Sequence, residues 1–140
     1  MFDMRIDMDR VQDLTRVTTF GQADADQISK IIRAPDYGHT SRVIWDLRAA
    51  CLSDLCQDEL IRIARAARDV GHRLNTQAIA FVVRGNDARL LIKLFTELYR
   101  HTFGRSIPCR ITSDMDDAHT WIDGVFPPQS VAHYTGACAG

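Results

Sequence analysis

The alternation of apolar and polar positions divides the 140-residue chain into strands and helices. Residues 2–8 and 14–20 alternate strictly, which is typical of half-exposed strands, and their short connection predicts an antiparallel hairpin. Residues 42–48 and 77–83 are instead largely continuous apolar runs, rich in β-branched and aromatic residues, as in strands buried on both faces of a parallel sheet. One helical pattern separates these two runs, so together they predict a βαβ unit.

Apolar residues also recur at helical spacing, and a short strand with an edge-type proline is expected at 107–111. Ser53 or Asp54 is the expected cap of the second helix. The order β-β-α-β-α-β-α-β-α predicts a single α/β domain in which helices cover a mixed sheet with an antiparallel edge hairpin. The helices are expected at about 24–34, 53–70, 87–103 and 113–122.

The chain loses its periodicity after Gly124. We therefore expect a folded domain over residues 1–124 and an irregular C-terminal tail over 125–140. The length suits one domain with a real core and is too short for two ordinary ones.

Composition places the chain among folded proteins, with 46% apolar and 25% charged residues. No apolar run approaches the ~18 residues of a membrane span, so no membrane insertion is expected. Acids in the first seven residues argue against an export signal, and the expected location is cytoplasmic. The net charge is −1, and residues 42–110 are mildly basic between acidic ends. Because acids interleave with those basic residues, no nucleic-acid binding is expected.

Candidate chemistry is sparse. The four cysteines and five histidines lack ligand spacing, so we expect no metal and no cofactor. Cys51 is the best thiol nucleophile candidate, but the sequence identifies no base for it. We predict no catalytic residues and no enzymatic activity.

Several short motifs make the chain resemble the STAS-like group, small bacterial domains with the SpoIIAA-like fold that are related to anti-sigma-factor antagonists. The motifs are Asp46-Leu47-Arg48 at a strand end, the strand at 78–83 and the segment at 113–122. The resemblance covers residues 2 to about 123 and implies a regulatory domain. Signalling members are phosphorylated at an Asp-Ser-Ser-Gly motif, and residues 54–57 stand there without it. Ser53 is therefore predicted to be a helix cap and not a phosphoacceptor.

Ligands of open α/β sheets bind beyond the carboxyl ends of the parallel strands. The residues expected there, and predicted as a ligand site, are Arg48, Ser53, Arg84, Gly85 and Asn86. A helix N-terminus after Gly85 would favour an anion, although the same residues also suit a plain turn and cap. Asp46 has two interpretations as well, an acid with a shifted pKa or a carboxylate that orders the adjacent loop.

The helix at 87–103 has a broader apolar surface than one core face needs. Leu91, Leu94, Phe95 and Leu98 form the expected core stripe. A second ridge of Ile92, Tyr99 and Phe103 would then be exposed, which predicts a homodimer or a partner surface there. The alternative is that the tail at 125–140 covers the ridge.

These observations lead to two functional hypotheses. The preferred one is a non-enzymatic cytoplasmic module that docks an unidentified partner protein or self-associates. The alternative is a carrier or sensor of a small ligand, whether an anion, a nucleotide or a lipid, bound at the strand ends or in a groove between helices.

Overall fold

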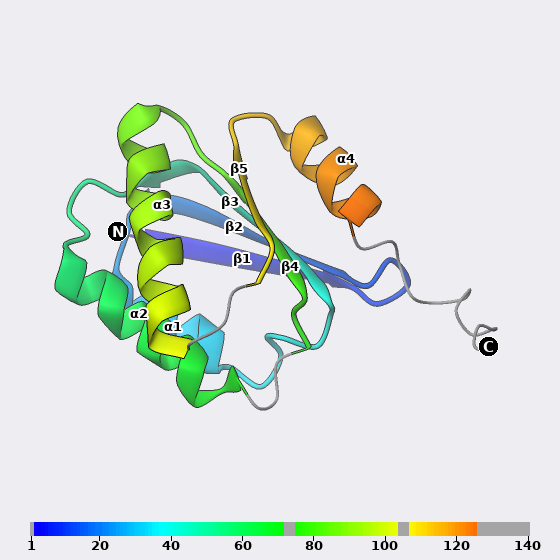
Figure 1. Ribbon diagram of the computed structural model, residues 1–140, viewed down its shortest axis with the longest axis horizontal. Helices are drawn as coiled ribbons and strands as arrows, with labels where there is room; N and C mark the ends of the chain where they lie inside the picture. Colours follow the sequence, from blue (N-terminus) through cyan, green and yellow to red (C-terminus); the bar gives the residue numbers. More distant parts are fainter. Residues whose placement is uncertain (1, 72–74, 104–106, 126–140) are drawn as a thin grey trace.

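The computed structural model describes residues 2–71, 75–103 and 107–125. These residues form a five-stranded sheet and four helices in the order that the sequence predicts (Figure 1). The strands are β1 (Phe2–Asp9), β2 (Leu14–Gln22), β3 (Arg42–Cys51), β4 (Ala78–Val82) and β5 (Cys109–Thr112). The helices are α1 (Ala25–Arg33), α2 (Gln57–Asp69), α3 (Asn86–Phe103) and α4 (Met115–Val125).

The sheet is mixed, and its strands lie side by side in sequence order. β1 pairs antiparallel with β2, and β2 to β5 are parallel to one another. Asp13 closes the β1–β2 turn with a φ of 56°, a left-handed conformation that aspartate tolerates better than most residues. The predicted mixed sheet with an antiparallel edge hairpin is therefore confirmed.

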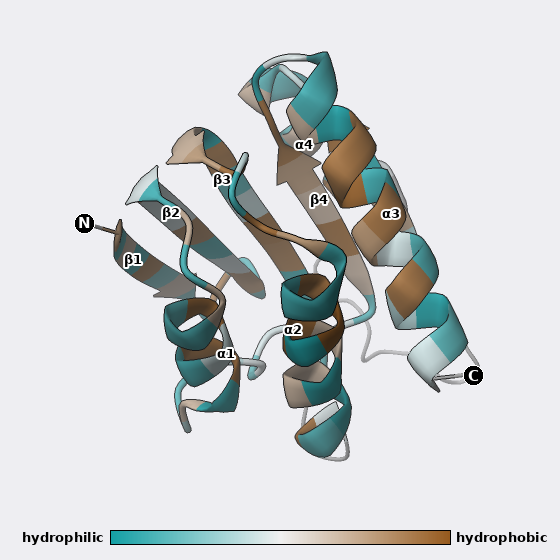
Figure 2. Ribbon diagram, turned by 90° about the vertical axis from the view of Figure 1, so that its left-hand side faces the viewer, coloured by the Kyte–Doolittle hydropathy of each residue, from teal (hydrophilic) through white to brown (hydrophobic). Residues whose placement is uncertain are grey.

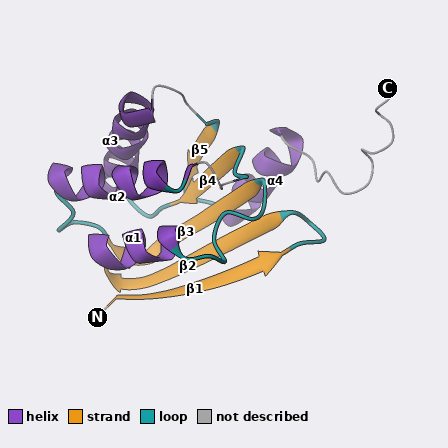
Figure 3. Cartoon of the chain, turned by 90° about the horizontal axis from the view of Figure 1, so that it is seen from below, coloured by secondary structure: helices purple, strands orange, loops and turns teal. Residues whose placement is uncertain are grey.

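The helices cover the two faces of the sheet unequally. α1, α2 and α3 lie on one face, and α4 lies alone on the other, over the β3–β5 half (Figures 1 and 3). Successive side chains of β3 and β4 point to opposite faces of the sheet. Val43 and Phe81 therefore lie in the larger core under α1–α3, and Ile44 and Val82 lie on the face that α4 covers. In Figure 2, β3 and β4 are largely brown, α1 and α2 in front of them are largely teal, and α3 shows both colours.

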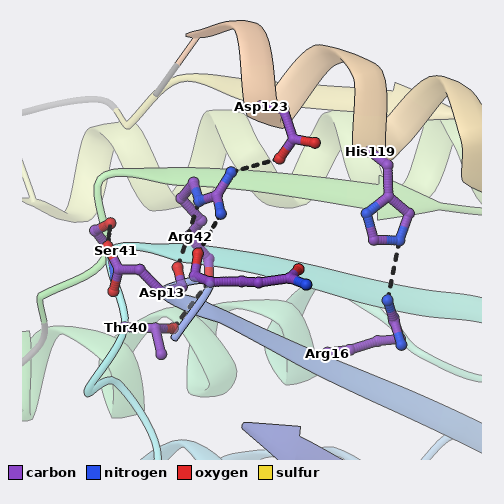
Figure 4. A network of polar contacts seen from close by, with 8 residues as sticks. Asp13, Arg16, Thr40, Ser41, Arg42, His119 and Asp123 are labelled. Atoms are coloured by element: carbon purple, nitrogen blue, oxygen red, sulfur yellow. Dashed lines mark hydrogen bonds and ion pairs between the residues drawn. The ribbon is translucent and has the colours of Figure 1, made fainter. Parts of the chain in front are cut away.

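α4 is fastened to the sheet by polar contacts around a buried cation (Figure 4). The Arg42 side chain is 1% exposed and donates from Nη1 to Asp123 Oδ1 at 2.6 Å. It also donates to the backbone carbonyls of Gln12 and Asp13, in the β1–β2 turn. Arg16 Nη2 lies 3.0 Å from His119 Nε2, so a second arginine links β2 to α4. Arg42 thus links the β1–β2 turn, the sheet and α4.

The α2 boundary differs from the prediction. β3 continues to Cys51 because it pairs with β2 up to Gln22, and α2 begins only at Gln57. The turn between them buries both Leu52 and Leu55 in the core. Because α2 begins at Gln57, the prediction of Ser53 or Asp54 as its cap is wrong. The cap residue is Cys56, whose N–H donates to Glu59 Oε1 at 3.1 Å.

No described helix is long and apolar enough to cross a membrane. The predicted domain boundary at 124 stays a prediction, because α4 continues to Val125 and residues 126–140 lie outside the described part of the chain.

Candidate functional site

All four helices begin at one edge of the sheet. The strands β2 to β5 run parallel, and each is followed by a helix, so the four strand-to-helix loops meet where the strands end. We call this edge the rim and define it by these loops with the strand and helix residues that adjoin them, 20–26, 46–59, 83–87 and 112–117. Most of the side chains in these loops are exposed.

Asp46 and Arg48 form an ion pair within β3, at the level where the neighbouring strand β4 ends at Val82. Arg48 Nε and Nη2 donate to the two carboxylate oxygens of Asp46, each at 2.9 Å, and the Arg48 N–H donates to Oδ1 at 3.2 Å. The hydrogen bond from the Arg48 side chain holds the pKa of Asp46 below its ordinary value of 3.8, although burial opposes this. Asp46 is thus an ionised group held by Arg48 of the same strand, and neither of its two predicted interpretations is tested by these contacts.

Ser53 and Cys51 are neighbours in the loop before α2. Ser53 Oγ lies 3.2 Å from Cys51 Sγ, and this hydrogen bond lowers the pKa of the exposed thiol. A lower pKa raises the thiolate fraction and with it the reactivity of Cys51.

Arg84, Gly85 and Asn86 are exposed at the β4–α3 junction. Gly85 has a φ of +89°, and its carbonyl accepts from the Arg89 N–H at 3.3 Å as α3 begins. A side chain at this position would have space but would be strained by the left-handed backbone. The structure therefore gathers the five predicted ligand-site residues at the rim, and their ligand remains a prediction.

Sequence reasoning missed the acidity of the rim. Each of the four helices carries acidic residues in its first turn: Asp26 in α1, Asp58 and Glu59 in α2, Asp87 in α3, and Asp116 and Asp117 in α4. Acids also cap two of these helices. Asp24 Oδ1 accepts from the Asp26 N–H at 2.9 Å, and Asp114 Oδ1 accepts from the Asp116 N–H at 3.1 Å. The signal was present in the sequence, since each acid stands within a few residues of a predicted helix start.

These carboxylates change the electrostatics of the rim. The positive end of a helix favours an anion, but here the protein's own acids already occupy that position. Arg84 is an exposed basic side chain of the rim, and Arg48 is paired with Asp46. Two of the first-turn acids are also paired, Asp26 with Arg62 and Asp117 with Arg110. Among the described residues Asp58, Asp87 and Asp116 form no ion pair, and they leave the rim acidic. The rim is therefore better suited to a cationic surface than to a phosphate or a nucleotide.

The predicted dimer ridge is not a surface of the chain. Ile92 is 6% exposed and belongs to the core under α1–α3, and Tyr99 is half-buried against the same core. Leu90 and Leu94 are exposed instead, at 54% and 41%. Leu91, Phe95 and Leu98 of the expected core stripe also pack against this core, so the core face of α3 spans both sets of residues. The expectation was wrong for Ile92, which is buried, and for Leu94, which is exposed, and the homodimer stays a prediction. The side chain of Phe103 lies outside the described part of the structure.

Among the described residues, no group of three or more His, Cys, Asp or Glu side chains is arranged to hold a metal ion. No protein-family model and no curated protein matches the sequence.

Solved structures do share the fold. One is an anti-sigma factor antagonist from Mycobacterium paratuberculosis, with 22% identity and a TM-score of 0.56 over 87% of this chain and 94% of that one. Another is an uncharacterised protein with a SpoIIAA-like fold from Shewanella loihica PV-4, with 14% identity and the same TM-score over 87% of this chain and 95% of that one. The chain therefore has the STAS/SpoIIAA-like fold that its motifs predict.

Proposed function

We propose that this chain is a non-enzymatic cytoplasmic regulatory module that docks a partner protein on its rim. The observation that carries the proposal is the acidic first turn of every helix at one edge of the sheet. Loops held at the strand ends of an α/β sheet are where such folds present their binding residues. A partner that places lysines or arginines opposite these carboxylates would be attracted and oriented by them.

The fold suggests which partner to test first. The similar structure from Mycobacterium paratuberculosis is an anti-sigma factor antagonist, so an anti-sigma factor is the first candidate for this chain. The alternative of an anion or nucleotide at the rim has less support, because acids already stand at the helix N-termini.

The test compares charge reversals at and away from the rim. Asp54→Lys and Asp87→Lys alter exposed rim carboxylates, and Asp36→Lys makes the same change in the exposed α1–β3 loop at the opposite edge. Affinity for each anti-sigma factor of the source organism is measured by biolayer interferometry at low and high salt. We expect each rim variant to weaken binding about tenfold, mainly at low salt, and the control to stay within about twofold.

Two results would count against the proposal. One is that no anti-sigma factor binds and chemical cross-linking in cells places every captured protein away from the rim. The other is that Asp36→Lys weakens binding as much as the rim variants do. Binding of phosphate or a nucleotide that Arg84→Gln abolishes would favour the alternative.

A further inference from the structure

A cavity lies inside the larger core, between the sheet and helices α1, α2 and α3. Its volume is about 90 Å³, and its wall is almost entirely apolar. β3 and β4 contribute Trp45 and Phe81, α2 contributes Ile63 and Ala67, and α3 contributes Phe95. Protein cores normally pack with few voids larger than a water molecule, so a cavity of this size needs an explanation.

A groove of about 200 Å³ adjoins this cavity. The two spaces share wall residues from β4 and α3, among them Phe81 and Phe95, and also Ile107 just before β5. The rest of the groove is polar, with Glu97 and Arg100 on α3. Their side chains are 60% and 49% exposed, so the groove reaches the surface. A single elongated molecule would therefore place its apolar part in the cavity and its polar end in the groove.

The cavity wall is interrupted by a few polar atoms. The Thr76 hydroxyl oxygen is buried and has no hydrogen-bond partner among the described residues. The other buried hydroxyl group is bonded, since Trp45 Nε1 donates to the Tyr37 hydroxyl at 3.3 Å. Such a wall suits an alkyl chain, which needs no hydrogen bonds, better than a sugar or a nucleobase.

The groove lies at the edge of the sheet opposite the rim, where the helices end in basic residues. Most of these are paired with acids, Arg33 and Arg68 with Asp69 and Arg100 with Glu97. The last turns of the helices that end there carry Lys30 and Arg33 in α1, Arg68 in α2, and Arg100 and His101 in α3. Arg100 Nη2 donates to Glu97 Oε1 at 2.5 Å. A guanidinium has five N–H donors in a fork, so Arg100 has donors left for a second carboxylate.

We infer that the cavity and the groove together bind a medium-length fatty acid, with its alkyl chain between the sheet and α2–α3 and its carboxylate beside Arg100. The site is independent of the proposed docking function, because it lies at the other edge of the sheet and uses none of the rim residues.

Decanoate and decanol are the probes, with the full chain as purified. Binding is measured by isothermal titration calorimetry and by tryptophan fluorescence, to which Trp45 in the cavity wall and Trp121 on α4 both contribute. We expect decanoate to bind with a Kd on the order of 10 μM and decanol to bind more weakly. Arg100→Gln should lower the affinity for decanoate about tenfold and leave the affinity for decanol unchanged. The control Arg65→Gln changes an exposed residue of α2 and should alter neither affinity.

Two variants test whether the alkyl chain of the ligand lies in the cavity. Ala67→Leu fills the cavity, and Ile107→Phe narrows the passage at a half-buried position that accepts a larger side chain more easily. Each variant should lower the affinity for both ligands at least tenfold, while its circular dichroism spectrum shows an intact fold. The inference is overturned if neither ligand binds at 1 mM, or if both folded variants bind as wild type does. Equal effects of Arg100→Gln on decanoate and decanol would overturn the placement of the carboxylate.

Discussion

At the scale of single residues, Tyr37 shows what burial in this core does to an ionisable group. Its ring packs edge-on against Trp45, with 6.1 Å between the centroids, and burial raises the pKa of its hydroxyl from 10.0 to about 12. The folded state therefore favours the neutral phenol. The resulting stabilisation is complete below pH 10, the pKa in the unfolded chain, and is lost as the pH rises toward 12.

Tyr37→Phe should remove this alkaline dependence. We expect the wild-type free energy of unfolding to fall by about 2–3 kcal/mol more than that of the variant between pH 10 and pH 12. Near pH 7 the variant should be less stable by about 1 kcal/mol, because Trp45 Nε1 loses its acceptor. Urea unfolding at a series of pH values measures both effects. Parallel curves for the two proteins would show that Tyr37 ionises as freely in the folded protein as in the unfolded chain.

The site residues could be located from the sequence but their roles could not. Arg48 and Ser53 were placed at the strand ends by a general rule of α/β sheets, and both lie at the rim. The role of Ser53 was wrong because a serine before an apolar period resembles a cap, whereas α2 starts four residues later, after a turn that buries Leu52 and Leu55. The local signal for this start is Glu59, which accepts from the Cys56 N–H, and it was missed because cysteine is not a usual cap residue.

At the scale of elements, the width of the core face of α3 is the main difference between expectation and structure, because this face includes Ile92 as well as Leu91, Phe95 and Leu98. A helical wheel ranks Ile92 and Leu94 as equally apolar and cannot decide which of them faces the sheet. The order of the strands and the hairpin were predictable from the pattern of apolar residues. Alternating apolar and polar residues indicate a strand buried on one face, and a continuous apolar run indicates a strand buried on both. The width of this face depends on how neighbouring elements pack, and α3 packs beside α2 and β5.

The core face of α3 can be tested with two alanine variants. Ile92→Ala should cost about 2–4 kcal/mol of unfolding free energy, because Ile92 is 6% exposed in the core. Leu94→Ala removes an equally large side chain that is 41% exposed and should cost less than about 1 kcal/mol. Guanidinium unfolding of both variants gives the comparison. Similar losses, or a larger loss at Leu94, would support the stripe expected from the sequence.

At the scale of the whole molecule, charge is polarised along the strand direction although the net charge is only −1. Acids stand at the helix starts on the rim, and the last turns of α1, α2 and α3 are basic at the opposite edge. This arrangement complements each helix dipole, which stabilises the helices by a few tenths of a kcal/mol per charge. It also means that the two edges favour different ligands: the rim favours a cationic partner, and the groove favours a carboxylate.

The two edges should act independently. The five residues of β4 between them span roughly 15 Å, which exceeds the screening length of about 8 Å at physiological salt. We therefore expect Asp87→Lys at the rim to change the Kd of decanoate by less than about twofold. Calorimetric titration of decanoate into wild type and Asp87→Lys at 150 mM salt measures this, with Arg100→Gln as the variant that does respond. A tenfold change would mean that α3, which runs from Asn86 at the rim to Arg100 at the groove, couples the two sites as a rigid element.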